Sequence, residues 1–336
     1  AFLPHLFLTA LILICGCCGN RGEGDGAVNP DFSLGDLVED FDPPTLEELE
    51  KKVSESGGWI DRPVEDGLQL LRDRQAGEEQ LVTVEEALKL KNNSDEDNEE
   101  ILSALGRLPE EDSEADYQAV ITRSTPQQLN HQNPLLASSM TEFEVLNLTS
   151  FGLFGFDWNF RPFGSKDAVV SWQTSKDGMY DKVVMRDDLL WSDGKPITAH
   201  DIEFSYKVIM TEAVPIRAQR TGTDQLKYVK AYDDHTIVYF HKAPLATNVW
   251  NINFSIIPKH IYEDSIAKDP NMTDSDYHIE LEEKPVVGGG YVVTKKDTTE
   301  IVLQRRESAY MFEGKQVRDK PFFRSVRLKI TPDMSV

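Results

Sequence analysis

The part of this sequence that most limits its fold begins at Tyr117, where short apolar runs start to alternate with helical stretches. The short runs are rich in β-branched and aromatic residues, which is typical of strands. Strands are therefore expected at residues 118–122, 182–186, 236–240, 291–294, 301–304 and 325–330, and a helix is expected at 142–148. This alternation indicates a mixed α/β fold.

The segment at residues 187–210 carries the strongest local signals. Asp193-Gly194 is typical of a tight turn, and Pro196 stiffens the exit from it. Thr198 is a favourable N-cap and Asp201 stands three residues later, which is a variant of the capping box. The following helix has a broad apolar face made by Ile202, Phe204, Tyr206, Ile209 and Met210. The segment thus predicts a strand, a tight turn and a capped helix in succession.

The negative charge of the chain is concentrated in one segment. The formal net charge is −23, and residues 19–115 contain 28 acidic and 9 basic side chains, whereas residues 116–336 contain 30 and 26. Such a chain repels phosphate groups, which argues strongly against nucleic acid as a partner. The charge also argues against attachment to anionic lipid by electrostatics alone. The balanced part, 116–336, is the expected globular domain.

The acidic segment and the residues before it divide into two parts by composition. Residues 18–44 are rich in Gly, Asn, Asp and Pro, which predicts a flexible tether. Residues 45–115 are expected to be acidic and partly helical, because residues 45–48 and 83–86 match the capping box. The run at 92–100 is interpreted as solvated surface, since it lacks the pattern of a calcium-binding EF-hand loop. Two roles stay open for residues 45–115: a stalk, or a helical prelude packed on the globular domain.

The three cysteines lie at the N-terminus, as Cys15, Cys17 and Cys18. The apolar run before them, residues 2–14, is shorter than the roughly 20 residues that span a membrane and fits a secretory signal. A small residue precedes Cys17, as in the bacterial lipobox that this stretch resembles. Residues 1–17 are therefore predicted to be a lipoprotein signal peptide with Cys17 lipidated, Cys15 and Cys18 being the alternatives. This implies a bacterial protein anchored by lipid in the periplasm or at the cell surface; a buried core helix is the competing interpretation.

Motifs for catalysis, metal binding and cofactor binding are missing from the sequence. The histidines form no HExxH pair and the serines no GxSxG elbow. Gly194-Lys195 and Gly314-Lys315 lack the rest of a phosphate-binding loop, and no helix is expected after the three glycines at 288–290, as a dinucleotide site requires. Beyond Cys18 there is no cysteine for a disulfide, a thiolate zinc site or a nucleophile. We predict no catalytic residue, no metal and no cofactor.

Several motifs, taken together and in order, resemble one known family. Residues 191–196 (WSDGKP) and 198–205 (TAHDIEFS) resemble a characteristic run of the family 5 extracellular solute-binding proteins. Residues 185–187, 233–238, 257–261 and 305–314 match further parts of the family pattern in the same order, and 125–134 resembles the loop after its first strand. Several short matches in register are a stronger signal than any one of them.

The resemblance covers residues 116–336 and implies their fold. It is lobe I of a periplasmic-binding-protein-like (type II) α/β architecture, with a mixed sheet and flanking helices. Gly288-Gly289-Gly290-Tyr291 departs from the Gly-Thr-Gly-Pro-Tyr that is usual in the family. Family members usually continue into a second lobe, and this sequence stops at Val336, near the crossover. The resemblance therefore implies the N-terminal part only, truncated before the second lobe.

The resemblance also implies a function. It is that of a receptor of an ABC importer, which captures a solute between two lobes and delivers it to a membrane permease. Oligopeptide is the first expectation for the solute, with nickel and oligosaccharide behind it. The residues expected at the ligand are Leu129, Asn130, Phe151, Phe154 and Trp250. Core packing is the alternative role for the aromatic residues at 151–160. A structural or adhesive surface lipoprotein that reuses the fold, and a secreted hydrolase, are the rival functions.

Overall fold

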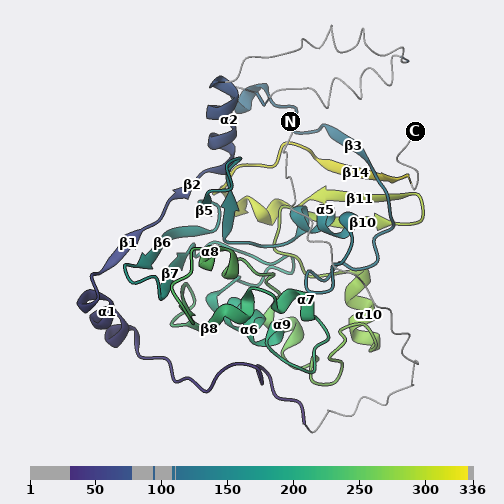
Figure 1. Ribbon diagram of the computed structural model, residues 1–336. Helices are drawn as coiled ribbons and strands as arrows, with labels where there is room; N and C mark the ends of the chain where they lie inside the picture. The colour runs from purple at the N-terminus through teal and green to yellow at the C-terminus, as the bar shows by residue number, and fades with distance from the viewer. Residues whose placement is uncertain (1–30, 78–93, 95–107, 110, 332–336) are drawn as a thin grey trace.

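The computed structural model of the protein describes residues 31–77, 94, 108–109 and 111–331. Two sheets dominate this part of the chain: a four-stranded sheet, and a five-stranded sheet that lies below it in Figure 1. The five-stranded sheet takes most of its strands from the middle of the chain, and the four-stranded sheet takes three of its four from after residue 290. The two sheets therefore define two regions of the molecule.

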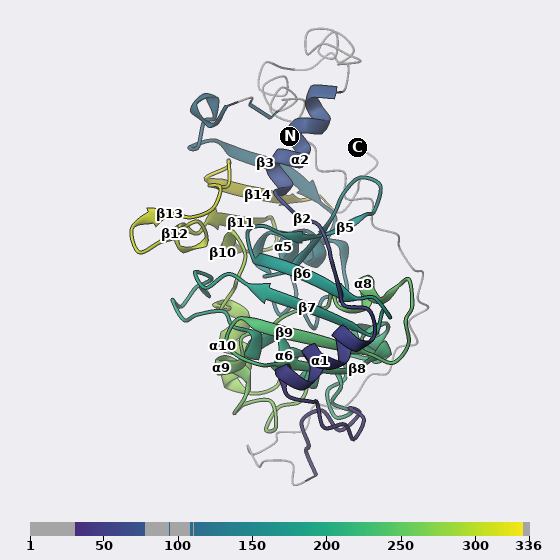
Figure 2. The same cartoon turned by 90° about the vertical axis from the view of Figure 1, so that its left-hand side faces the viewer.

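The five-stranded sheet is antiparallel and has the order β1-β6-β7-β9-β8. Its strands are β1 (Trp59–Asp61), β6 (Val169–Ser175), β7 (Tyr180–Met185), β9 (Thr236–His241) and β8 (Leu226–Ala231). Successive side chains of a strand point to opposite faces. Ile237 and Tyr239 pack in the cluster with helix α6 (Ala199–Ile209), whereas Val238 and Phe240 pack in the cluster with helix α1 (Leu46–Glu55). Each face of the sheet is thus covered by a helix, and Figure 2 shows α1 lying across the near face.

The strand, turn and capped helix expected around residues 183–210 are confirmed as β7 and α6. The N–H of Thr198 donates to the carboxylate of Asp201 at 2.8 Å. Gly194 has a φ of 85° in the turn, a left-handed conformation that favours glycine. Asp201 also accepts the N–H of Lys259 at 2.8 Å, at the start of α9 (Lys259–Tyr262). Asp201 therefore caps α6 and also ties the start of α6 to the start of α9.

Residues 31–44 differ from the flexible tether that was expected there. The N–H of Leu37 donates to the carbonyl of Met210 at 2.9 Å. The ring of Phe41 lies 5.3 Å from that of Phe240, on the α1 face of the sheet. The tether prediction rested on Gly, Asn, Asp and Pro, and it overlooked the apolar side chains between them, which find a core to pack on.

The first part of the acidic segment also belongs to the fold. Thr45 caps α1 as predicted, with its N–H donating to Glu48 at 2.9 Å. Leu49 and Val53 are fully buried. Strand β1 then joins the edge of the five-stranded sheet, and β2 (Val64–Glu65) and α2 (Gly67–Gly77) follow along the left side of Figure 1. For residues 45–77 the packed prelude is therefore favoured over the stalk.

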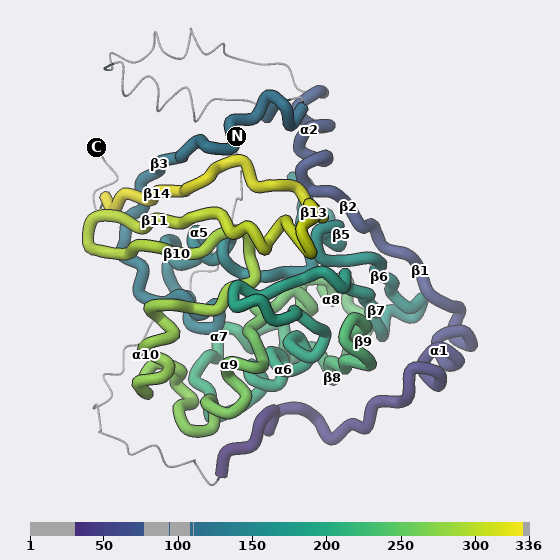
Figure 3. Tube along the Cα trace, turned by 180° about the vertical axis from the view of Figure 1, so that it is seen from behind, coloured from purple at the N-terminus to yellow at the C-terminus, as the bar shows by residue number. Residues whose placement is uncertain are grey.

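The four-stranded sheet has the order β10-β11-β14-β3, and Figure 3 shows its strands side by side. They are β10 (Tyr291–Lys296), β11 (Glu300–Arg305), β14 (Ser325–Ile330) and β3 (Val120–Thr125). The β14–β3 pair is parallel and the others are antiparallel, so the sheet is mixed as expected. Helix α5 (Met140–Thr149) covers one face, where Val145 packs with Leu303. The other face carries the exposed side chains of Arg327 and Lys329.

The strands expected from residue 182 onward are confirmed within two residues at each end. The strand expected at 118–122 begins instead at Val120, because the N–H groups of Gln118 and Ala119 turn back onto Asp116. The remaining strands and α-helices are short: β4 (Phe154–Phe156), β5 (Pro162–Ser165), β12 (Met311–Phe312), β13 (Lys315–Gln316), α7 (Arg217–Arg220), α8 (Asn248–Asn251) and α10 (Asp276–Glu283). Single turns of 3-10 helix lie at Asp112–Glu114, Thr223–Gln225 and Glu307–Ala309.

Five predictions lie outside the described residues and stay predictions. They are the signal peptide at 1–17, the lipidation of Cys17, the tether over 18–30, the capping box at 83–86 and most of the solvated run at 92–100. Within the part of the chain that the structure describes, no helix is both long and apolar enough to cross a membrane.

Candidate ligand-binding site at the seam between the two sheets

Two hollows lie where the regions of the two sheets meet, and Ser150, Phe151 and Gly288 line both of them. The smaller pocket has a volume of about 20 Å³. The larger hollow has a volume of about 350 Å³ and is lined by residues within 147–152, 165–168, 189–197, 288–290, 306–309 and 318–321. Small-molecule sites usually measure roughly 300–1,000 Å³. The larger hollow, called the seam groove below, therefore has the size of a site for a small solute.

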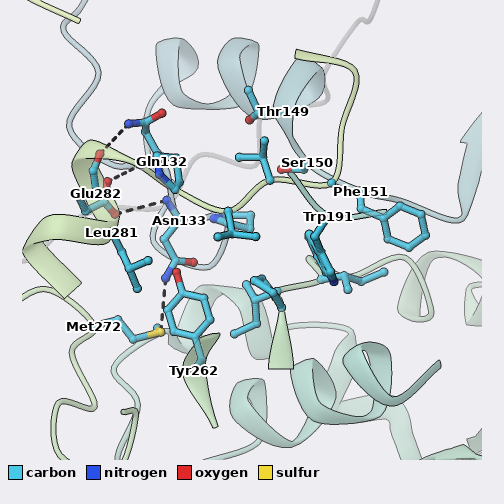
Figure 4. A pocket seen from close by; sticks show the side chains of 18 of the residues that line it. Gln132, Asn133, Thr149, Ser150, Phe151, Trp191, Tyr262, Met272, Leu281 and Glu282 are labelled. Carbon is cyan, nitrogen blue, oxygen red and sulfur yellow. Dashed lines mark hydrogen bonds between the residues drawn. The ribbon is translucent and has the colours of Figure 1, made fainter. Parts of the chain in front are cut away.

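One wall of the smaller pocket is polar, and Figure 4 shows how its groups bond to one another. The N–H of Gln132 donates to the Glu282 carboxylate at 2.7 Å, and its side-chain amide donates to the Glu282 carbonyl at 2.6 Å. The side-chain amide of Asn133 donates to the sulfur of Met272 at 3.4 Å. These bonds fasten the loop after β3 to Glu282 near the end of α10 and to Met272 before its start.

The rest of the smaller pocket is apolar and closely packed. Trp191, Tyr262 and Leu281 contribute to it, and burial raises the pKa of Tyr262, which keeps the phenol protonated. A cavity needs roughly 10–15 Å³ to hold one water molecule. The smaller pocket thus has room for little more than a water, and it acts as a joint between the two regions.

Three residues beside this joint have the spacing of a hydrolase triad. His278 is buried, with Nε2 2.9 Å from the Ser265 hydroxyl and Nδ1 2.7 Å from the Asp269 carboxylate. Acyl transfer also requires free N–H donors that receive the developing oxyanion. The N–H groups of Ser265 and Ile266 both donate to the carbonyl of Tyr262 instead, at 3.2 and 3.0 Å. The set therefore ties α10 to the turn after α9, and it gives no support to the secreted-hydrolase interpretation.

The glycines at 288–290 form a wall of the seam groove and bring two backbones into close contact. A Cβ on Gly288 would lie 2.6 Å from the Cβ of Phe151, and one on Gly289 would lie 2.6 Å from the carbonyl oxygen of Leu148. At Gly290 the nearest atom, in Pro321, would lie at an ordinary 3.5 Å. The first two glycines are thus required for packing, whereas the third is not.

Charged side chains are distributed unevenly around the seam groove. Arg318 is paired with the buried Asp188, which also accepts from Arg186 Nε at 2.9 Å. Burial alone would raise the pKa of Asp188. The attraction of these two cations outweighs burial, so the pKa of Asp188 is lowered. Arg306 is buried too, and burial followed by the nearby charge of Arg318 lowers its pKa to about 10. Asp167 and Asp319 supply the carboxylates of the groove.

The structure separates the five residues that were expected at the ligand. Phe151 lines both hollows. Leu129 is buried in the core of the four-stranded sheet, and Asn130 beside it is exposed. Phe154 packs edge-on against Trp172, at 4.9 Å between ring centroids, and Trp250 stacks on Phe156 at 4.1 Å. Only Phe151 is at the seam groove, so the five do not form one site in the described part of the chain.

Several lining residues of the two hollows were not predicted. Gln132 and Asn133 lie two or three residues beyond Asn130, in the loop that the family resemblance had singled out. The three glycines had been noted as a departure from the family pattern, which was the available signal for the groove wall. Arg306 had no sequence signal that separated it from other arginines.

The family of the chain follows from its sequence. Residues 166–336 match the family described as "Bacterial extracellular solute-binding proteins, family 5 Middle". The match covers half of the chain, and the chain belongs to this family. The architecture is accordingly that of a periplasmic-binding-protein-like α/β fold.

Individual relatives are more distant. The chain is 27% identical to Protein XP55 of Streptomyces lividans over 164 residues, which are 49% of this chain and 27% of that protein. The oligopeptide-binding protein AppA of Bacillus subtilis, solved with a nonapeptide, aligns with a TM-score of 0.54 and 20% identity over 66% of this chain and 41% of its own. DppA of Helicobacter pylori, solved with the peptide STSA, gives a TM-score of 0.53 and 19% identity over 65% and 44%. The chain therefore spans less than half the length of these relatives.

Proposed function

We propose that this protein is the solute-capturing receptor of an ABC importer and that its solute is a peptide. The observation that carries the proposal is the family match over residues 166–336. The likeness in fold to peptide-bound AppA and DppA supports it. Since such a receptor breaks no bond, its task is to desolvate the solute, hold it and release it to a membrane permease.

The seam groove supports the proposal because it has the volume of a small-solute site. Its walls come from the regions of both sheets. In the proposed mechanism the groove supplies part of the capture surface. A hinge closure, the usual motion of periplasmic binding proteins, couples occupancy to docking on the permease.

We further propose that the receptor acts outside the cytoplasm and is held to the membrane by lipid on Cys17. A single acyl chain binds membranes only marginally, so stable anchoring requires more than one chain. Metabolic labelling with an alkyne fatty acid tests the anchor in the native host. Labelling is expected to disappear in Cys17→Ser and to persist in Cys15→Ser and Cys18→Ser. Persistence in Cys17→Ser would contradict this anchor.

The solute is tested by thermal unfolding of the purified protein with panels of peptides, sugars, and nickel complexes. A ligand at about 100 times its Kd adds about 2.7 kcal/mol of stability, which is easily seen as a rise in Tm. The proposal predicts that peptides raise the Tm and that the other two panels do not. A rise with sugars or nickel complexes alone would replace peptide by that class. No rise with any panel would favour the structural lipoprotein.

A further inference from the structure

A group of exposed aromatic rings lies apart from the two hollows of the seam. It is called the aromatic platform below, and it consists of Phe156 at the end of β4, Trp158 and Phe160 in the turn that follows, and Trp250 in α8. Trp158, Phe160 and Trp250 are 40%, 51% and 47% exposed. The four rings line neither hollow. Several large apolar side chains exposed near one another mark an interaction site, whereas a single one needs no explanation.

The two tryptophans of the platform each have one covered face and one open face. Phe156 stacks on Trp250, with 4.1 Å between the ring centroids and 8° between the ring planes. The guanidinium of Arg74 lies 4.8 Å from the ring centroid of Trp158. Since both tryptophans still have about half of their surface exposed, the faces opposite these neighbours are open to solvent. The neighbours also hold the rings in place, so a ligand that stacks on them costs little side-chain entropy.

The third exposed ring stands on a strained backbone. Phe160 has a φ of 58°, a left-handed conformation that favours glycine and asparagine. The turn imposes this conformation: the Asp157 carboxylate accepts the N–H groups of Asn159 and Arg161, both at 2.8 Å, and the Asp157 carbonyl accepts the N–H of Phe160 at 2.9 Å. A half-exposed phenylalanine at such a position costs stability. Strain of this kind is concentrated at functional sites.

The platform lies in a neutral part of an acidic chain. Residues 244–256 contain no charged side chain, and residues 154–162 contain only Asp157 and Arg161, which pair with each other at 2.8 Å. Arg74 also contacts the platform, through its guanidinium. The whole chain, by contrast, has a formal net charge of −23. A surface with so little charge of its own has no means of selecting a strongly charged partner, and it favours an uncharged one.

We infer that the aromatic platform binds an extended, uncharged polysaccharide chain. The C–H groups on the face of a sugar ring are weakly positive, and the negative face of an aromatic ring attracts them. Asn159 and Asn253, in the same two segments, are exposed and can bond to sugar hydroxyl groups. The platform is an open surface, which suits a chain that passes over it, because single small molecules usually bind in enclosed pockets.

Affinity electrophoresis of the full chain in native gels tests the inference. The gels contain hydroxyethylcellulose, galactomannan or glycol chitin, which are soluble polysaccharides of low charge. At least one of them is expected to slow the parent protein, and the dependence on polysaccharide concentration gives a Kd. Because an open surface contacts only one side of each sugar ring, short sugars are expected to bind too weakly to raise the Tm.

Matched variants separate binding from folding. Trp158→Ala and Trp250→Ala each remove one stacking surface and are expected to weaken binding about 2- to 10-fold, the range of a single aromatic contact. Tyr277→Ala removes an exposed ring from α10 and is the control that is expected to bind as the parent does. Phe160→Asn is expected to keep or raise the Tm, because asparagine tolerates the left-handed conformation, and yet to weaken binding.

The outcomes decide this inference independently of the receptor function, because the platform and the two hollows share no lining residue. Slowing by none of the three polysaccharides, or equal slowing of the parent and both tryptophan variants, would show the inference to be wrong. A peptide that raises the Tm is expected to leave the slowing unchanged, and competition would place the platform in the solute site instead. Binding to phosphatidylcholine vesicles that is lost in Trp250→Ala would replace the polysaccharide by a membrane surface.

Discussion

The five-stranded sheet has a helix on each face, whereas the four-stranded sheet has α5 on one face and solvent-exposed charges on the other. In the first, Ile237 and Val238 are both fully buried although they point in opposite directions. In the second, Leu328 is buried and its neighbours Arg327 and Lys329 are exposed. An antiparallel or mixed sheet with one wet face is stable but contributes less buried area.

This difference indicates which of the two regions contributes most of the stability and which contributes groups to the groove. The five-stranded region carries the largest hydrophobic cluster among the described residues and is expected to dominate the free energy of unfolding. The four-stranded region supplies the glycine loop and Arg306 to the seam groove. The groove therefore takes one wall from a rigid core and another from the less covered sheet. Four predictions test this comparison.

The largest effect is expected inside the five-stranded sheet, at Asp181. This buried carboxylate accepts hydrogen bonds from Trp172 Nε1 at 2.8 Å and Thr174 Oγ1 at 2.5 Å, and it shares a hydrogen bond with His241 Nε2 at 2.7 Å. Asp181→Ala leaves these donors without an acceptor and is expected to cost about 3–5 kcal/mol in urea unfolding. The exposed Asp187→Ala is the control and is expected to cost almost nothing. A loss below about 1 kcal/mol for Asp181→Ala would contradict the rigid-core description.

The next effect concerns the helix that covers the near face of that sheet. Leu49 of α1 is fully buried against the cluster that contains Phe240. Leu49→Ala removes buried methyl groups and leaves a cavity, which typically costs about 2–5 kcal/mol. Lys51→Ala, on the exposed side of α1, is the matched control. Equal stability of the two variants would mean that α1 is a stalk and that the sheet is covered on one face only.

A smaller effect is expected at the seam. Gly289→Ala places a Cβ 2.6 Å from the carbonyl oxygen of Leu148, which forces the 288–290 loop away from the end of α5 and is expected to cost about 1–3 kcal/mol. Gly290→Ala makes only an ordinary contact and is expected to unfold as the parent does. Thermal unfolding tests this: the Tm of Gly289→Ala is expected to lie below that of Gly290→Ala. If the order were reversed, the close backbone approach at the seam would be wrong.

The smallest effect is a pH dependence in the four-stranded region. Burial alone would raise the pKa of Glu142, but hydrogen bonds from the N–H groups of Ser138, Ser139 and His131 outweigh it and lower the pKa. A depressed carboxylate pKa stabilises the fold above the unfolded pKa, and this contribution is lost as pH falls through the folded value. As the pH falls below about 5, stability is therefore expected to fall by more in the parent than in Glu142→Gln. Parallel slopes in the two proteins would contradict this role.

Local signals explain why much of the fold was predictable. The turn at Asp193-Gly194 and the cap at Thr198 are decided by residues a few positions apart, and both formed as expected. The packing of residues 31–44 depends on contacts with Met210 and Phe240, which lie far away in the sequence. No local pattern contains that information.

The candidate site was harder to predict for the same reason. Phe151 was selected from an aromatic cluster, and it does line the seam groove. Leu129 was selected from the loop after the first strand, and its side chain points into the core of the four-stranded sheet. Arg306 joins the groove lining because it lies beside the 288–290 loop, 16 or more positions earlier in the chain. The groove is lined by residues from the regions of both sheets, so it exists only when the two sheets are packed together.

The most direct test of the central claim is a titration followed by amide NMR spectra of the isotope-labelled protein. The claim is that the seam groove captures the solute. Addition of a peptide that raises the Tm is expected to shift the amide signals of Gly288 and Gly290 and the Nε–H signal of Arg306, and to leave the signals of α1 unchanged. Saturable shifts confined to other parts of the molecule, or no shift at millimolar peptide, would contradict the account.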